Sequence, residues 1–231
     1  MKKVEIRYSK IFEKFPREFI LLQGSGCFWK KCKFCDYFED VSEDPFELNS
    51  KVIEKITGEF GILDVINSGS AMELDDKTLD LIYKKCLEKN IKGLWFEVHW
   101  AYRNKLEKFA ERFKGIKVKF RTGIETFNGE LRSSWNKGIP EDVTAEDVSK
   151  YFSSVCLLVG VKGQKFETIK SDIELAKKYF ERFTVSVFVK NSTRISPDPI
   201  LIGKFIKEIY PKIKNDRQID ILISNTDLGV G

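Results

Sequence analysis

Three of the five cysteines lie close together in the sequence, at positions 27, 32 and 35. They form a Cys-x4-Cys-x2-Cys pattern directly after an apolar run at residues 19–23, which predicts a first strand. Thiolates gathered in one short loop are the ligands that a soft metal centre needs. A structural zinc site takes four ligands, whereas three cysteines on a [4Fe–4S] cluster leave one iron open. The pattern therefore predicts a metal centre held by Cys27, Cys32 and Cys35.

Two other interpretations of this loop stay open. It is a zinc knuckle if His99 supplies a fourth ligand, or it holds three thiols that are close only by chance. Cys86 lies in a predicted helix and Cys156 in an apolar strand, so we expect both to be buried packing residues. The odd, clustered cysteines favour metal binding in a reducing cytoplasm over a disulfide framework.

Composition narrows the class of protein. The chain has 231 residues, of which 42% are hydrophobic and 13% aromatic, enough to build a core. One histidine against 19 phenylalanines argues against a His-rich metal enzyme or a Ser–His hydrolase. The net charge is +5, from 40 basic and 35 acidic residues, and does not indicate a nucleic-acid partner. We see no signal peptide and no apolar run that could span a membrane, so we expect a cytoplasmic protein without membrane contact.

Strand-length apolar runs alternate with amphipathic helical stretches. We expect strands at 19–23, 61–67, 93–98, 116–123, 155–160, 183–189 and 219–223, and helices at 52–60, 75–87, 103–113, 144–152, 166–180 and 199–210. This alternation predicts an α/β fold with parallel strands, either a partial (β/α)6 TIM-like barrel or an open doubly wound sheet. We expect one domain over 1–231, with a core at 19–190 and a terminal helix and strand at 197–224. In both folds chemistry gathers at the carboxyl ends of the strands.

The cysteine loop resembles the signature of the radical SAM superfamily, Cys-x3-Cys-x-aromatic-Cys after the first barrel strand. Phe34 stands at the aromatic position, immediately before the third cysteine. One extra residue separates the first two cysteines here. The resemblance favours the partial barrel and implies a [4Fe–4S] cluster and S-adenosylmethionine as cofactors.

Further segments resemble the superfamily in the same order along the chain. Residues 68–70 stand where the family has a Gly-Gly-Glu-like stretch, and residues 159–164 resemble its Gly-x-Pro-Gly turn without the proline. Small residues at such a turn allow a close approach to the backbone. The resemblance implies the following contacts with S-adenosylmethionine: Phe34, Ser68, Gly69, Ser70, Glu97, Glu125, Lys137 and Val161.

The short chain, the cysteine spacing and the Asn-Ser-Gly-Ser stretch are together similar to the queuine lyase family. That resemblance implies a lyase in which a 5′-deoxyadenosyl radical abstracts hydrogen from queuine and leaves 7-aminomethyl-7-deazaguanine. It also implies a low-potential electron donor such as flavodoxin or ferredoxin. The tRNA-modifying relatives carry added RNA-binding domains that we do not see here, so we expect a small-molecule substrate and no tRNA binding.

A 7-deazaguanine offers N–H donors and a flat ring, which amides, carboxylates and aromatic rings at strand ends recognise. The candidate substrate contacts are Gln23, Asn67, Tyr37, Trp100, Phe188, Asn191, Asn225 and Asp227. The aromatic members fit core packing equally well. His99 is a candidate proton-transfer residue, although a lone histidine is often only a structural group.

Two other functions fit the same residues. One is a radical SAM enzyme that modifies tRNA or a peptide. The other is a non-catalytic zinc or iron–sulfur module.

Overall fold

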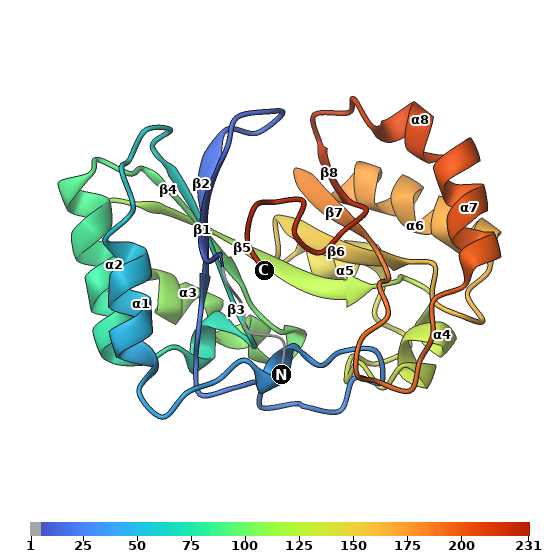
Figure 1. The fold of residues 1–231 in the computed structure, drawn as a ribbon, viewed down its shortest axis with the longest axis horizontal. Helices are drawn as coiled ribbons and strands as arrows, with labels where there is room; N and C mark the ends of the chain where they lie inside the picture. Colours follow the sequence, from blue (N-terminus) through green and yellow to red (C-terminus); the bar gives the residue numbers. More distant parts are fainter. Residues whose placement is uncertain (1–5) are drawn as a thin grey trace. The chain divides into compact units, whose positions relative to one another are not determined.

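The computed structural model describes residues 6–231, whose strands form an eight-stranded sheet hydrogen-bonded in chain order (Figure 1). Strand β1 (Tyr8–Ile11) pairs antiparallel with β2 (Arg17–Leu22), and β2 pairs parallel with β3. The remaining strands are β3 (Ile62–Asn67), β4 (Gly93–Glu97), β5 (Lys117–Glu125), β6 (Ser154–Val159), β7 (Arg182–Val187) and β8 (Ile219–Leu222). Parallel pairing between strands joined by helices is what the alternating sequence pattern predicts.

Internal contacts divide the chain into two compact units, with a boundary inside β5. Unit 1 comprises residues 1–30, 37–120 and 228–231, and unit 2 comprises residues 31–36 and 121–227. Unit 1 contains α1 (Pro45–Ile53), α2 (Asp76–Glu88), α3 (Leu106–Ala110) and the 3₁₀ turns η1 (Tyr37–Glu39), η2 (Ala71–Glu73) and η3 (Trp100–Lys105). Unit 2 contains α4 (Gly129–Ser134), α5 (Ala145–Ser149), α6 (Phe166–Tyr179), α7 (Pro199–Glu208) and α8 (Tyr210–Ile213). The expectation that the chain acts as one domain remains a prediction.

The strands of unit 1 carry different residues on their two faces. On one face, Leu22 and Val65 are fully buried. On the other face, Phe19, Asp64 and Trp95 lie side by side on the neighbouring strands β2, β3 and β4. Asp64 accepts a hydrogen bond from Arg17 Nε at 3.1 Å, with both side chains completely buried. A buried charge needs such a partner, because desolvation of an unpaired ion is costly.

The strands of unit 2 also carry different residues on their two faces. Val155 and Phe183 are fully buried, whereas Gly123, Cys156 and Thr184 form a row of small residues across β5, β6 and β7. Cys156 belongs to this second row and is partly exposed. Our expectation of a buried packing cysteine is therefore wrong at this position, because its neighbours in the row are too small to cover it.

Most predicted elements are present, with two clear corrections. The helix expected at 52–60 is α1, which begins at Pro45 and ends at Ile53. Proline is favoured in the first turn of a helix, and Glu18 accepts hydrogen bonds from the backbone N–H groups of Thr57 and Gly58, which holds this stretch outside the helix. The helix expected at 103–113 is shorter, since residues 100–105 form η3 before α3. No helix within residues 6–231 is both long enough and apolar enough to cross a bilayer.

Candidate functional site

Glu73 joins the Cys27 loop to the turn at residues 68–70 in unit 1. Its Oε1 accepts from the backbone N–H of Phe28 at 2.9 Å, and its Oε2 accepts from the backbone N–H of Ser70 at 2.7 Å. A Cβ atom on Gly69 would collide with Glu73 Oε2 and would lie 3.1 Å from the backbone nitrogen and Cα of Cys27. The turn therefore lies close to the cysteine backbone, and a larger residue than glycine would displace the Glu73 carboxylate.

Sequence reasoning missed Glu73, although a signal for it was present. Ser70 and Glu73 form a capping box at the start of η2, and Ser-x-x-Glu is the usual spacing of that motif. Burial raises the pKa of Glu73, and the hydrogen bonds from Phe28, Ser70 and Tyr102 offset this only in part. Burial and the Glu73 charge in turn raise the pKa of the Tyr102 hydroxyl, which donates to Glu73 at 3.5 Å.

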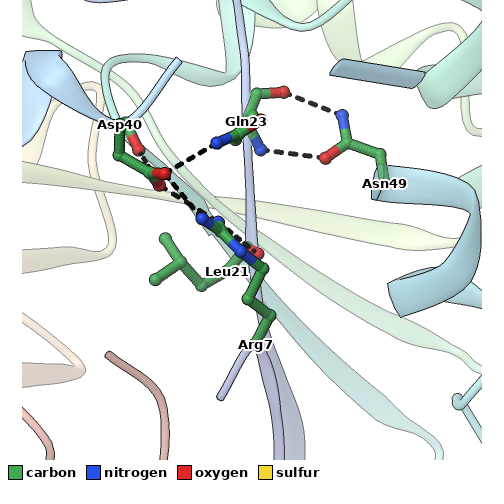
Figure 2. A network of polar contacts seen from close by, with 6 residues as sticks. Arg7, Leu21, Gln23, Asp40 and Asn49 are labelled. Atoms are coloured by element: carbon green, nitrogen blue, oxygen red, sulfur yellow. Dashed lines mark hydrogen bonds and ion pairs between the residues drawn. The ribbon is translucent and has the colours of Figure 1, made fainter. Parts of the chain in front are cut away.

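A second network in unit 1 is centred on Asp40, which sequence reasoning also missed (Figure 2). Asp40 accepts from both terminal nitrogens of Arg7, from Gln23 Nε2 at 2.7 Å and from Ser68 Oγ at 2.7 Å. Asn49 binds the backbone N–H and carbonyl of Gln23, at 2.9 and 2.8 Å. Burial would raise the pKa of Asp40, but hydrogen bonds from Arg7, Gln23 and Ser68 outweigh it and lower the pKa. Asp40 is thus an ionised group that ties the end of β2 to the turn after β3.

In unit 2, Glu125 and Lys137 form a close ion pair, with Lys137 Nζ 2.7 Å from Glu125 Oε1. Glu125 ends β5 with a φ of 66°, after a register shift between Gly123 and Glu125. A Cβ atom on Gly123 would lie 2.5 Å from Glu125 Oε1 and 3.0 Å from Lys137 Nζ. The irregular strand end and the glycine together make room for this pair, and a left-handed non-glycine residue is typical of functional sites.

Lys137 also faces the second half of the cysteine loop. Its ammonium lies 5.6 Å from the centre of the Phe34 ring. Burial would lower the pKa of Lys137, but the charges of Glu125, Cys32 and Cys35 and the hydrogen bond to Glu125 outweigh it and raise the pKa. Lys137 is therefore a permanent cation beside two thiols, where it favours their thiolate form.

The loop around Cys32 and Cys35 is anchored to other parts of unit 2. Lys33 donates its backbone N–H to the Trp135 carbonyl at 2.9 Å, and Asn191 Nδ2 donates to the Phe34 carbonyl at 2.7 Å. The two cysteines pack against a buried cluster of Phe34, Trp135, Leu158, Val161 and Phe188.

The chemistry of the donor set fits an iron–sulfur cluster. All five cysteines are free thiols, and Cys27, Cys32 and Cys35 are all partly exposed. Cys27 belongs to unit 1 and the other two to unit 2. Within residues 6–231 no three His, Cys, Asp or Glu side chains are gathered as a metal site, so the ligand set stays a prediction. Three accessible thiols and a buried cation beside two of them suit an anionic cluster bound by thiolates.

Comparison with solved structures identifies a relative over nearly the whole chain. A queuine lyase from Clostridium spiroforme, solved bound to SAM and queuine, is 46% identical, with a TM-score of 0.93 over 98% of this chain and 99% of that chain. The chain belongs to the queuine lyase family of radical SAM enzymes. Its fold class is accordingly the α/β partial (β/α)6 barrel that the sequence predicts for this superfamily.

Other comparisons add less. A methylornithine synthase is 14% identical, with a TM-score of 0.49 over 92% of this chain and 74% of that chain, which is too low to support an argument. No protein-family model and no curated protein sequence matches the chain.

The single histidine of this chain, His99, is the N-cap residue of the 3₁₀ turn η3. His99 Nδ1 accepts from the backbone N–H of Ala101 at 3.2 Å, which places the proton of the neutral ring on Nε2. The ring stacks on Trp29 and meets Phe28 edge-on, with ring centres 6.2 and 5.3 Å apart. Capping accounts for Nδ1, and a role for His99 in proton transfer stays a prediction.

The remaining predicted residues divide into those near these networks and those apart from them. Asn67 Nδ2 donates to the Ser70 carbonyl at 3.1 Å, and Glu97 ends β4 partly exposed. Val161 and Phe188 are core residues of unit 2, and Trp100 is buried with Arg103 over its ring. Tyr37 is exposed in η1, and its carbonyl accepts from the backbone N–H of Asp40 at 3.1 Å. Two others lie apart from the networks above: Asn225, which is exposed near the C-terminus, and Asp227, which accepts from the backbone of Ile223 and Ser224.

Proposed function

We propose that this chain is a queuine lyase that removes the cyclopentenediol of queuine and leaves 7-aminomethyl-7-deazaguanine. The observation that carries the proposal is the similarity to the queuine-bound relative, which extends over 98% of this chain.

We assign the [4Fe–4S] ligands to Cys27, Cys32 and Cys35. When bound, the cluster and S-adenosylmethionine supply a 5′-deoxyadenosyl radical that abstracts hydrogen from the substrate. The protein's part is to position these groups. Glu73 holds the backbone beside Cys27, and Lys137 places a buried positive charge beside Cys32 and Cys35.

We assign S-adenosylmethionine binding to three strand ends. The turn at 68–70 offers small residues and backbone groups to the methionine ammonium, and Glu97 offers a carboxylate to the ribose hydroxyls. Glu125 and Lys137 offer one charge of each sign to the zwitterionic methionine end. Phe34 and Val161, both buried in unit 2, would pack against the cofactor.

We assign substrate recognition to Gln23, Asn191 and the aromatic side chains near the cysteine loop, with Asn67, Tyr37, Trp100, Phe188, Asn225 and Asp227 as further candidates. His99 is the candidate proton donor through Nε2. Closely spaced reduced thiols fit a cytoplasmic enzyme served by a low-potential donor such as flavodoxin or ferredoxin.

The test is a single-turnover reaction under anaerobic conditions. The reconstituted holoenzyme is incubated with queuine, S-adenosylmethionine and dithionite, and products are identified by mass spectrometry. We expect 7-aminomethyl-7-deazaguanine and 5′-deoxyadenosine together, and neither when dithionite is omitted.

Two outcomes would contradict the proposal. Formation of 5′-deoxyadenosine with queuine unchanged would leave a radical SAM enzyme with a different substrate. Colourless, zinc-loaded protein that does not cleave S-adenosylmethionine would indicate a binding module.

A further inference from the structure

Gln23 stands at the carboxyl end of β2, and its side chain is almost completely buried, with 6% exposed. Its backbone is fixed by two hydrogen bonds to Asn49, so the position of its Cα is set independently of its side chain. The side-chain amide is held separately, by Asp40 (Figure 2).

The two oxygens of Asp40 are fully used by protein donors. Oδ1 accepts from Arg7 and from Gln23 Nε2, while Oδ2 accepts from Arg7 and from Ser68 Oγ. A carboxylate offers about four lone-pair positions, and four donors occupy them here. Asp40 therefore has no acceptor position left for a ligand. It can influence ligand binding only by orienting the side chains that donate to it.

Asp40 determines which way the Gln23 amide faces. An ionised carboxylate can only accept hydrogen bonds, so Gln23 must turn its NH2 group towards Asp40 and its Oε1 away. The bidentate contact with Arg7 keeps the carboxylate ionised. The negative charge of Asp40 thus fixes the orientation of the Gln23 amide.

Gln23 Oε1 is buried and has no hydrogen-bond partner among residues 6–231. Gln164 provides a comparison, since its side chain is equally buried, at 6%. Its Oε1 accepts from the Gly160 backbone N–H and its Nε2 donates to the Leu158 carbonyl, both at 2.9 Å. Gln164 is a satisfied structural clamp, whereas Gln23 presents an oriented acceptor that is costly to leave unpaired.

We propose that Gln23 is a specificity residue whose Oε1 accepts a hydrogen bond from an N–H of the guanine-like edge of the substrate, and that Asp40 is the positioning residue that fixes this acceptor. The inference rests on the proposed function, which supplies the deazaguanine. S-adenosylmethionine also carries N–H donors, its methionine ammonium and its adenine amino group, and the experiment separates the cofactor from the substrate.

The first test is Gln23→Met, which keeps the size of the side chain and removes both polar atoms. Anaerobic calorimetry on the holoenzyme measures queuine binding with S-adenosylmethionine present, and S-adenosylmethionine binding alone. We expect queuine affinity to fall about tenfold, the value of one hydrogen bond to a buried acceptor, and S-adenosylmethionine affinity to stay within about twofold. Gln218→Met is the matched control, because it is the same change at a glutamine whose side-chain Nε2 donates to the Lys177 and Phe180 carbonyls.

The second test is Asp40→Asn, which lets the Gln23 amide turn its NH2 group towards the ligand. We expect a similar loss of queuine affinity. In the Gln23→Met background, Asp40→Asn should cause no further loss of queuine affinity, because it acts through Gln23. Asp40→Asn also provides the comparison if Gln23→Met does not fold.

Each remaining outcome overturns the inference. Unchanged queuine affinity in Gln23→Met would show that Oε1 has no ligand partner. Loss of S-adenosylmethionine affinity instead would assign the acceptor to the cofactor. Additive losses in the double variant would give Asp40 a purely structural role. Wild-type enzyme that does not bind queuine would overturn the proposed function itself, and this inference with it.

Discussion

At the scale of single residues, burial sets Cys86 apart from the three cysteines of the loop. Cys27, Cys32 and Cys35 are partly exposed, whereas Cys86 is fully buried in α2. Burial, with a smaller contribution from the Glu18 charge, raises the pKa of Cys86 to about 12. The thiolate is the form that binds metal, so a thiol with so high a pKa does not serve as a ligand at neutral pH.

Alanine substitutions should therefore fall into two groups. Replacing Cys27, Cys32 or Cys35 should abolish the visible absorbance of the cluster and the production of 5′-deoxyadenosine, measured after anaerobic reconstitution. Cys86→Ala should retain iron and turnover and lose about 1 kcal/mol of stability, since it removes one small buried group. Equal loss of iron from Cys86→Ala would show that the ligand set is wrong.

Asp172 is a buried carboxyl group that secures the segment after Glu125. Its Oδ1 accepts from the backbone N–H of Phe127 at 2.8 Å. Burial raises the pKa of Asp172 to about 6, against hydrogen bonds from Thr126 and Phe127 and the charge of Arg132. A raised pKa means that the folded state favours the protonated form, so this contribution to stability is present at low pH and is lost as the pH rises through about 6.

Asp172→Asn should remove that dependence, since asparagine keeps an acceptor for Phe127 without the charge. The stability of the wild type relative to Asp172→Asn should fall by about 1 kcal/mol between pH 5 and pH 7. Urea unfolding of both proteins at three pH values measures the difference. A difference that does not vary with pH would mean that Asp172 does not titrate in this range.

At the scale of elements, the turn after β3 positions the first cysteine. Gly69 lies against the Cys27 backbone, and Glu73 ties both to η2. Gly69→Ala would place a Cβ atom where it displaces the Glu73 carboxylate, which holds the Phe28 and Ser70 backbone, and presses on the Cys27 backbone. We expect slower cluster assembly and at least tenfold weaker binding of S-adenosylmethionine, followed by iron content and calorimetry.

Gly203 offers the matched control for this substitution. It lies in α7, and a Cβ atom there would contact nothing within 4 Å. Gly203→Ala should keep cofactor binding and gain up to about 1 kcal/mol of stability, because alanine is the better helix former. If both variants bind S-adenosylmethionine like the wild type, the close approach at Gly69 has no functional role.

Local patterns predicted the elements whose causes are local. The Asp75 cap of α2 and the Thr144 cap of α5 lie at the first residues of the helices predicted at 75–87 and 144–152. The end of α1 depends instead on Glu18, 39 residues away from Thr57. The role of Asp40 could not be predicted from the sequence either, because its partners Arg7 and Ser68 lie 33 and 28 residues from it. Side chains that join distant loops leave no spacing to recognise, which is why the cysteine motif was predictable and its supporting carboxylates were not.

At the scale of the whole molecule, charge helps to decide between a free base and RNA as substrate. The chain carries 40 basic and 35 acidic residues. Several lysines on the surface are paired within their own helices, such as Lys51 with Glu47 and Lys150 with Asp147. Such pairs neutralise the surface locally, whereas a nucleic-acid site needs a concentration of unpaired positive charge.

The salt dependence of substrate binding tests whether the substrate is a free base or RNA. An RNA held by six to ten phosphate contacts would lose roughly a thousandfold or more in affinity between about 50 and about 200 mM salt. A free base makes at most one or two ionic contacts, so the KM for queuine should change by less than about threefold over that range. Unmodified tRNA at about 10 μM should not inhibit the reaction, because it has no site to occupy. Salt-sensitive inhibition by tRNA would indicate an RNA-binding site on the enzyme and would contradict the expectation that it does not bind tRNA.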